Sequence, residues 1–252
     1  MGELTQELID KGLNELKQEN WSAALTYFQK AIEKNPQDAD GWLYVGYCYG
    51  NLGRHQDAVD ALKQAIRIKP DDAEAHNNLG TAYGSLGCWQ EAIEACKQAI
   101  RIKPDYAEAH NNLGVAYDKL GRYQDEIESC NQAIRIKPDL ALAHNNLGVA
   151  YDKLGHYEES IEAYKQAIRI KPDYADAHYN LGVAYGSLGR YQDAIETFKQ
   201  AIRIKLDYAE AHFNLGLAYL ATGDKGSALE EYKILKTLDA ERANKLFNLI
   251  NE

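Results

Sequence analysis

Apolar residues recur every three or four positions along most of the chain, which is the spacing of one buried helix face. Residues 73–106 show two such stripes in succession. The first comprises Ala75, Leu79, Ala82, Tyr83 and Leu86, and the second Trp89, Ala92, Ile93, Cys96, Ala99 and Ile100. Gly87 separates them, and Pro104, whose ring disfavours helix at the preceding residue, ends the second. The pattern predicts a hairpin of two helices.

This pattern returns with a period of 34 residues. All five prolines follow it, at Pro36, Pro70, Pro104, Pro138 and Pro172. The period defines seven units, at residues 5–38, 39–72, 73–106, 107–140, 141–174, 175–208 and 209–242. Because one hairpin cannot bury both of its apolar stripes, neighbouring units are expected to stack and share a core. We therefore predict that residues 1–252 form a single solenoid domain.

The ends of the chain depart from the repeat, as expected of units with one face in water. Ala240 stands where other units have proline. Apolar residues then continue at helical spacing, at Ala243, Leu246, Phe247 and Ile250. Residues 243–252 are predicted to form a capping helix.

Residues at the expected helix ends suit turns and caps. Glycines that tolerate positive φ lie between the two helices of six units, at Gly53, Gly87, Gly121, Gly155, Gly189 and Gly223. A carboxylate follows the proline position in five units, at Asp71, Asp105, Asp139, Asp173 and Asp207. We expect these carboxylates to cap the following helices.

One family shares these features. Its signature positions are matched by Trp42, Val45, Gly46, Tyr49, Ala58, Leu62, Ala65 and Pro70. The chain thus resembles the tetratricopeptide repeat (TPR) family over all seven units. The resemblance implies an all-α, right-handed superhelix of seven hairpins plus a capping helix. It also implies a non-enzymatic adaptor or scaffold, which holds extended peptides on the concave surface formed by the first helices.

The chain departs from the family at a few positions. Histidine replaces the signature tryptophan at His76, His110, His144, His178 and His212. We expect these rings to pack at the seams between repeats, where acidification would loosen the stack by charging them. Stacked hairpins would hold them about 8–10 Å apart, too far to share one zinc ion. No metal or cofactor is predicted.

Five asparagines recur on the first helices, at Asn78, Asn112, Asn146, Asn180 and Asn214. They resemble the asparagine ladder in the TPR repeats of O-linked N-acetylglucosamine transferase, in which such amides bind the backbone of an extended polypeptide. Nothing in the chain resembles that enzyme's catalytic domain. An amide offers a donor and an acceptor, so a ladder would hold a peptide without reading its side chains. The alternative is that each amide bonds the adjacent helix.

An apolar stripe is predicted beside the ladder, at Tyr47, Thr81, Val115, Val149, Val183 and Leu217. Its expected flanking residues are Asn77, Asn111, Asn145, Tyr179 and Phe213. The stripe would seat ligand side chains, with Tyr179 and Phe213 as the hydrophobic anchor. For these two aromatic residues, packing between repeats is the alternative.

The same surface is expected to be acidic. Its carboxylates are Asp40, Glu74, Glu108, Asp118, Asp152, Asp176 and Glu210, and its lysines are Lys119 and Lys153. This excess predicts a neutral to basic ligand, and a simple solvated face is the alternative. The net charge of −10 and the pI of about 5.2 argue against nucleic acid as a partner.

Other features narrow the function classes. No phosphate loop, HExxH or GxSxG motif is present, so no enzyme is predicted. Four cysteines, Cys48, Cys88, Cys96 and Cys130, lack CxxC spacing and are expected to be reduced thiols, with a zinc site or disulfide as the alternative.

No apolar run approaches the roughly 18 residues of a membrane span, and the first residues do not resemble a signal peptide. A cytoplasmic protein is expected, unless a leader was removed. The sequence thus predicts a protein-binding scaffold. The alternative is a scaffold that self-assembles into homo-oligomers through its ends or its groove.

Overall fold

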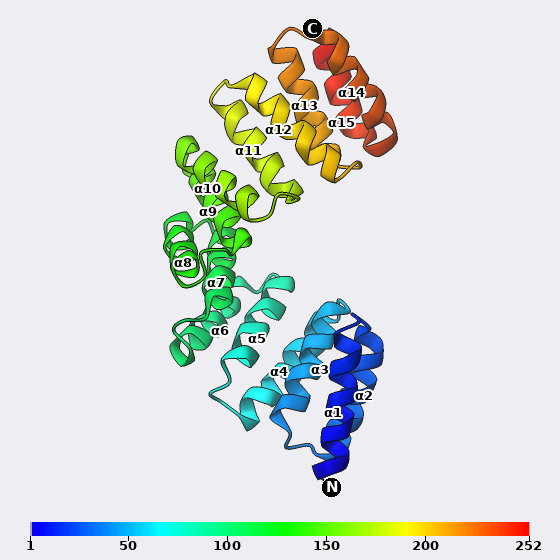
Figure 1. Ribbon diagram of the computed structural model, residues 1–252, viewed down its shortest axis with the longest axis vertical. Helices are drawn as coiled ribbons and strands as arrows, with labels where there is room; N and C mark the ends of the chain where they lie inside the picture. The colour runs from blue at the N-terminus through cyan, green and yellow to red at the C-terminus, as the bar shows by residue number, and fades with distance from the viewer. Residues whose placement is uncertain (1, 252) are drawn as a thin grey trace. The chain divides into compact units, whose positions relative to one another are not determined.

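The computed structural model describes residues 2–251, which form fifteen α-helices and no strand (Figure 1). The helices are α1 (Gly2–Leu16), α2 (Trp21–Lys34), α3 (Ala39–Asn51), α4 (His55–Ile68), α5 (Ala73–Ser85), α6 (Trp89–Ile102), α7 (Ala107–Lys119), α8 (Tyr123–Ile136), α9 (Ala141–Lys153), α10 (Tyr157–Ile170), α11 (Ala175–Ser187), α12 (Tyr191–Ile204), α13 (Ala209–Ala221), α14 (Lys225–Leu238) and α15 (Ala240–Asn251). Helices α1 to α14 pair into seven consecutive hairpins, and α15 packs on α13 and α14. None of the helices within the described residues is both long and apolar enough to cross a membrane. The predicted all-α fold of seven hairpins and a last helix is confirmed.

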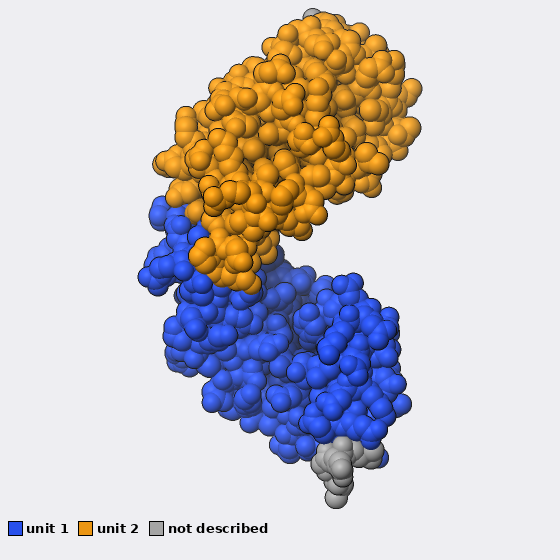
Figure 2. All heavy atoms as spheres, in the orientation of Figure 1, with its two compact units in different colours: residues 1–136 blue, residues 137–252 orange. Residues whose placement is uncertain are grey.

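The chain divides into two compact units, Met1–Ile136 and Lys137–Glu252 (Figure 2). The first unit holds the hairpins of α1 to α8, and the second holds those of α9 to α14 together with α15. Within each unit, the second helix of one hairpin packs against the first helix of the next. A single solenoid domain over residues 1–252 stays a prediction.

The first helix of each hairpin lies on the inner side of its unit. In the first unit α5 contacts both α3 and α7, and in the second unit α11 contacts both α9 and α13. No comparable contact joins α4 to α6, or α10 to α12, in the described residues. Since the first helices approach one another more closely than the second helices do, their exposed faces form what we call the inner surface of each unit.

Three of the four cysteines lie in the cores of the units. Cys48, Cys96 and Cys130 are buried, Cys88 is half-buried, and all four are free thiols. Burial raises the pKa of the Cys48 thiol to about 12, and it does the same for Cys96. These three side chains therefore pack as small neutral hydrophobic groups.

Each turn glycine adopts the expected left-handed backbone conformation. The six φ angles lie between 70° and 82°. These glycines end the first helices, because a residue with a Cβ rarely adopts this conformation.

The expected capping carboxylates are wrong by one position. Helix α5 begins at Ala73, so the residue that precedes it is Asp72 and not Asp71. The Asp72 Oδ1 accepts hydrogen bonds from the backbone N–H groups of Glu74, at 3.0 Å, and Ala75, at 3.1 Å. In the next four hairpins this position holds Tyr or Leu, and no side chain caps the helix.

Replacing Asp72 with alanine is expected to lower the free energy of unfolding by about 1 kcal/mol, because two N–H groups at the start of α5 lose their acceptor. The matched control is Asp71→Ala, which removes an exposed carboxylate without a hydrogen bond and should change stability by less than about 0.5 kcal/mol. Urea unfolding followed by circular dichroism measures both. Equal effects would contradict this assignment of the cap.

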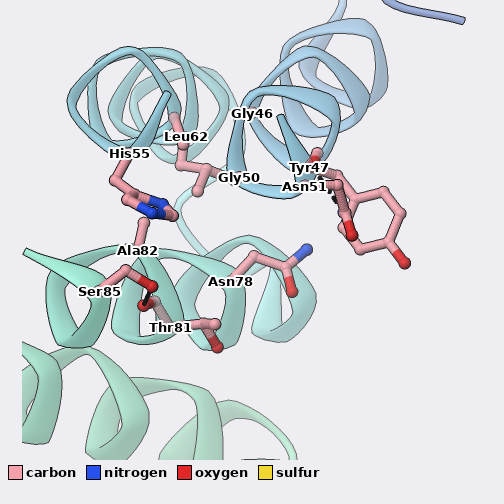
Figure 3. A pocket seen from close by; sticks show the side chains of 11 residues that line it. Gly46, Tyr47, Gly50, Asn51, His55, Leu62, Asn78, Thr81, Ala82 and Ser85 are labelled. Carbon is pink, nitrogen blue, oxygen red and sulfur yellow. Dashed lines mark hydrogen bonds between the residues drawn. The ribbon is translucent and has the colours of Figure 1, made fainter. Parts of the chain in front are cut away.

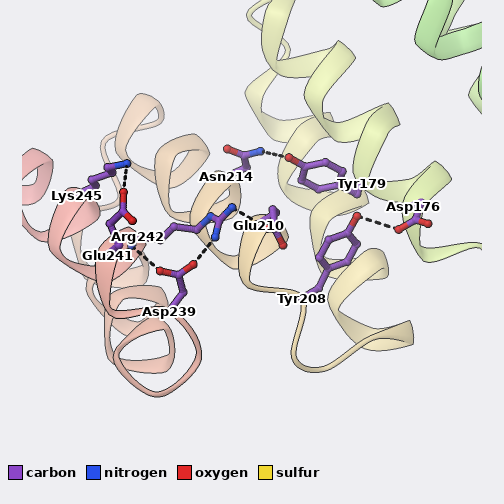
Figure 4. A network of polar contacts seen from close by, with 9 residues as sticks. All are labelled: Asp176, Tyr179, Tyr208, Glu210, Asn214, Asp239, Glu241, Arg242 and Lys245. Carbon is purple, nitrogen blue, oxygen red and sulfur yellow. Dashed lines mark hydrogen bonds and ion pairs between the residues drawn. The ribbon is translucent and has the colours of Figure 1, made fainter. Parts of the chain in front are cut away.

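The last helix begins three residues earlier than the sequence predicts, at Ala240 instead of Ala243. The Asp239 carboxylate accepts a hydrogen bond from the backbone N–H of Arg242, at 2.9 Å, and also pairs with the Arg242 guanidinium (Figure 4). The same guanidinium lies 2.7 Å from Glu210, which joins α15 to α13. The predicted start was late because the 34-residue period assigns residues 240–242 to the last repeat. Alanine at position 240 replaces the proline of the repeat. Residue 252 lies outside the described residues.

The repeated histidines take over the hydrogen bond of the tryptophan that they replace. Trp42 Nε1 donates to the carbonyl of Pro36, six residues earlier, at 3.0 Å. In His76, His110, His144 and His178 the Nε2 lies 2.9–3.0 Å from the carbonyl of the equivalent proline. Since a carbonyl only accepts, each Nε2 carries the hydrogen. The rings tie each first helix to the loop before it, instead of packing only at the seam between repeats.

Candidate functional site

The five asparagines of the predicted ladder occupy one repeat position on α5, α7, α9, α11 and α13, and all are half-exposed. Three of them donate their side-chain N–H to the preceding hairpin of the same unit. Asn112 donates to Asn77 Oδ1 at 3.0 Å, Asn180 donates to Asn145 Oδ1 at 3.1 Å, and Asn214 donates to Tyr179 Oη at 2.9 Å. The alternative interpretation, a bond to an adjacent helix, therefore describes at least one N–H group of each of these amides.

These bonds leave part of each amide unused. A carboxamide has two N–H groups and an oxygen with two lone pairs. The oxygens of Asn112, Asn180 and Asn214 accept no hydrogen bond within the described part of the chain. The internal bond thus fixes how the amide is turned and leaves its oxygen available. One N–H also stays available in Asn180 and Asn214, whereas Asn112 Nδ2 donates to Thr81 Oγ1 as well, at 3.3 Å. Asn146 Oδ1 receives a long contact, 3.5 Å, from Asn145.

Asn78 differs from the other ladder residues. The residue that would accept its N–H, 35 positions earlier, is Leu43, which has no polar side-chain atom. Within residues 2–251 the Asn78 side chain makes no hydrogen bond. All of its hydrogen-bonding capacity is available.

Three of the five residues expected to flank the stripe are buried and cannot contact a ligand. Asn77, Asn111 and Asn145 are only 6, 2 and 7% exposed, since this position faces the next hairpin. Tyr179 packs on the rings of Phe198 and Tyr208, with ring centroids 5.9 and 5.1 Å apart. Phe213 packs on the core cluster formed by α14 and α15. For both aromatic residues, packing between elements is what the structure shows. Both side chains are half-exposed, and their role as an anchor stays a prediction.

Three hollows lie beside the ladder, where the predicted stripe runs. Val115, Val149 and Val183 are half-exposed, and two of them line hollows. The hollows have volumes of about 210, 250 and 280 Å³. Each combines two glycines four residues apart with a ladder asparagine of the next hairpin: Gly46, Gly50 and Asn78; Gly80, Gly84 and Asn112; Gly182, Gly186 and Asn214.

The glycine pairs are the signal in the sequence that distinguishes the hairpins with hollows, and the repeat pattern alone did not reveal it. The second glycine of each pair is replaced by Asp118 in one hairpin and by Asp152 in the next. The Asp152 carboxylate accepts hydrogen bonds from Ser160 Oγ at 2.7 Å and Tyr164 Oη at 2.9 Å. It therefore lies against its own second helix. Burial raises the pKa of Asp152, and these two hydroxyl groups offset only part of that rise.

Three of the seven expected acidic groups are engaged inside the second unit. Asp152 binds the hydroxyl groups named above, Asp176 accepts a hydrogen bond from Tyr208 Oη at 2.9 Å, and Glu210 pairs with Arg242 (Figure 4). Of these three groups, Glu210 has its charge balanced by a cation, while Asp152 and Asp176 accept hydrogen bonds from hydroxyl groups.

Sequence profiles of one repeat family match most of the chain. Profiles described as "TPR repeat" match residues 85–121, 153–189 and 186–223. Profiles described as "Tetratricopeptide repeat" match residues 9–73, 61–94, 107–140, 129–162 and 209–241. Together these matches cover residues 9–241 without a gap.

Solved structures show the same fold. A chain of the APC/C hetero-tetramer Cut9-Hcn1 is 21% identical with a TM-score of 0.78, and the match covers 89% of this chain but 45% of that one. The MamA protein is 30% identical with a TM-score of 0.59, over 70% of this chain and 96% of that one. YrrB, described as "a TPR protein with an unusual peptide-binding site", is 23% identical with a TM-score of 0.57, over 73% and 95%.

The period, the turn glycines and the paired helices agree with these matches throughout residues 9–241. The chain belongs to the tetratricopeptide repeat family.

Proposed function

We propose that this protein is a non-enzymatic scaffold that holds an extended peptide segment of a partner protein on its inner surface. Proteins with TPR repeats are generally scaffolds for protein–protein interactions, and the same fold carries a peptide-binding site in YrrB. One observation carries the proposal. Two amides with a fixed orientation and an uncommitted oxygen, Asn112 and Asn214, and the amide of Asn78 lie beside hollows of side-chain size.

In this proposal the ladder binds the ligand backbone. An asparagine oxygen accepts a hydrogen bond from a ligand N–H, and the second amide N–H donates to a ligand carbonyl. Each such bond contributes about 0.5–1.5 kcal/mol net, so the ladder alone gives weak binding. Burial of ligand side chains in the hollows must supply the rest of the affinity.

The ligand is neutral to basic. Asp40, Glu74 and Glu108 belong to the first unit, and Glu74 and Glu108 lie in the first turns of their helices. Burial raises the pKa of Glu74, and the charges of Asp72 and Asp40 raise it further, which indicates a locally negative field. A peptide with lysine or arginine near its ends would be attracted by this field.

A displayed library of random twelve-residue peptides, selected on the intact chain, tests this function. The decisive variant combines Asn112→Ala with Asn77→Leu, because removing both ends of the internal bond leaves no buried acceptor without a donor. Leucine occurs at the equivalent position one hairpin earlier, Leu43. We expect this variant to bind a selected peptide about tenfold more weakly, measured by fluorescence anisotropy.

Gln124→Ala is the matched control, since Gln124 is exposed on the second helix α8 and should not contact the ligand. Thermal unfolding of each variant separates lost binding from lost folding. Equal affinities for the wild type and the double variant would remove the ladder from the binding mechanism.

Self-assembly is a second candidate function, favoured by apolar side chains at one end of the second unit. Ile234, Leu238, Phe247 and Leu249 on α14 and α15 are 37–42% exposed. Light scattering over a concentration series tests this candidate. A constant monomer mass would rule it out.

A further inference from the structure

One of the three hollows is chemically different from the other two. It lies between α3, α4 and α5 in the first unit, and Figure 3 shows its lining. Gly46, Gly50, Ala58, Leu62 and Ala82 provide its apolar lining. Two polar side chains that line it, His55 and Asn78, make no hydrogen bond within residues 2–251 (Figure 3).

The sequence explains both uncommitted groups. Asn78 has no partner because Leu43 occupies the position of the usual acceptor. His55 stands where other hairpins have an aromatic side chain, Trp89, Tyr123, Tyr157 or Tyr191. Its Nδ1 is buried and has no hydrogen-bond partner. A buried polar atom in this state costs about 1–3 kcal/mol.

The lining also indicates the charge of that group. None of the residues that line this hollow is Asp, Glu, Lys or Arg. An ionised ligand side chain would lose its hydration here without gaining a counter-charge, which is costly. The hollow therefore favours a polar but uncharged group.

The donors and acceptors that line the hollow narrow the choice of ligand side chain further. Asn78 offers donors and an acceptor together, and a neutral imidazole offers one of each. The side-chain hydroxyl groups of Thr81 and Ser85 already donate to backbone carbonyls, at 3.2 Å each. Thr81 Oγ1 also accepts from Asn112 Nδ2 at 3.3 Å, so Ser85 Oγ is the hydroxyl oxygen of this lining that has no donor within the described residues. A carboxamide is the side chain that both donates twice and accepts at one end.

We propose that this hollow recognises a glutamine or asparagine side chain of the bound peptide. The inference rests on the proposed peptide-binding function and adds a specificity to it. His55 and Asn78 are the residues that distinguish this carboxamide from an apolar side chain.

The adjacent hollow of the same unit gives the ligand a second feature. It is lined by Trp89, Val115 and Ala92. Its Asn112 side chain donates a hydrogen bond to Asn77. This lining suits an apolar side chain. Neighbouring packed helices lie about 8–10 Å apart, and three residues of a polyproline-type extended chain span about 9 Å and return to the same face. The expected ligand therefore has an apolar residue three positions from the carboxamide.

The test is a selection of the same twelve-residue peptide library on the wild type and on two variants, Asn78→Leu and His55→Tyr. On the wild type we expect enrichment of glutamine or asparagine at one position, with an apolar residue three positions away. Both variants should still select peptides but lose the carboxamide. A selected peptide should bind Asn78→Leu about tenfold more weakly, and its glutamine→leucine version should lose less affinity on this variant than the selected peptide does.

Gln124→Ala, exposed on the second helix α8 and away from the hollows, is the matched control and should retain the carboxamide enrichment. Asn78→Leu breaks no internal hydrogen bond, so its melting temperature should not fall and it carries the test if His55→Tyr is unstable. Peptides enriched without a carboxamide, or with Asp or Glu at that position, would overturn this inference and leave the proposed function standing. Recovery of no peptide at all would overturn both.

Discussion

Replacing Glu231 with alanine is expected to lower the free energy of unfolding by about 3 kcal/mol at pH 6. His212 and Glu231 form a buried pair, with side chains 5 and 13% exposed and with 2.6 Å between Nδ1 and Oε2. His212 Nε2 lies 3.2 Å from the carbonyl of Leu206. Because a carboxylate and a carbonyl both accept, the ring uses both nitrogens as donors and is an imidazolium. Removal of Glu231 leaves the buried ring without its counter-charge.

The same pair makes stability depend on pH. Burial lowers the pKa of His212, but the hydrogen bonds to Glu231 and Leu206 and the charge of Glu231 outweigh burial and raise it. A raised pKa in the folded state means that the stabilisation is complete below the unfolded value of about 6.5 and is lost as the pH rises through the folded value. Acidification to pH 6 thus strengthens this contact, contrary to the sequence-based expectation that charged histidines loosen the stack.

Urea unfolding from pH 5.5 to 9 measures this effect. Glu231→Gln keeps the shape of the side chain and should flatten the pH dependence in that window. Glu230→Ala is the matched control, because Glu230 is exposed next to Glu231 and pairs only with Lys233. A pH profile of Glu231→Gln that matches the wild type would exclude the pair as its source.

Gly182→Ala is expected to destabilise the second unit by about 2 kcal/mol. A Cβ at Gly182 would lie 2.6 Å from Phe198 Cε1 and 2.9 Å from Thr197 Oγ1. Phe198, on α12, is only 3% exposed and packs against Tyr179 of α11 in the core cluster of this unit, so its ring cannot move away without disturbing the core.

Gly186→Ala is the matched control on the same helix, one turn further on. A Cβ there would meet no atom within 4 Å, and alanine is a better helix former than glycine. We expect this variant to be more stable than the wild type by about 0.5–1 kcal/mol. Thermal unfolding of the two variants should move in opposite directions. If both variants lost stability, the close contact of Gly182 with α12 would not be the cause.

The order of the helices and the turns could be predicted from the sequence, because both depend on local rules. The 34-residue period, the apolar stripes and the turn glycines each act within a few residues of chain. The errors at Asp71 and Ala243 have one origin, since the position of a helix start depends on one or two residues that a repeat frame averages over.

The chemistry of the inner surface could be predicted only in part. The amino-acid pattern was enough to place Asn78, Asn112 and their equivalents at one repeat position on the first helices, because helical periodicity decides which face a residue occupies. What each side chain is free to do depends instead on packing in three dimensions. Contacts between hairpins bury Asn77, cover part of Tyr179, engage the side-chain nitrogen of Asn112, and leave Asn78 and His55 uncommitted. Such contacts join residues about 35 positions apart, and a pattern read within one repeat does not contain them.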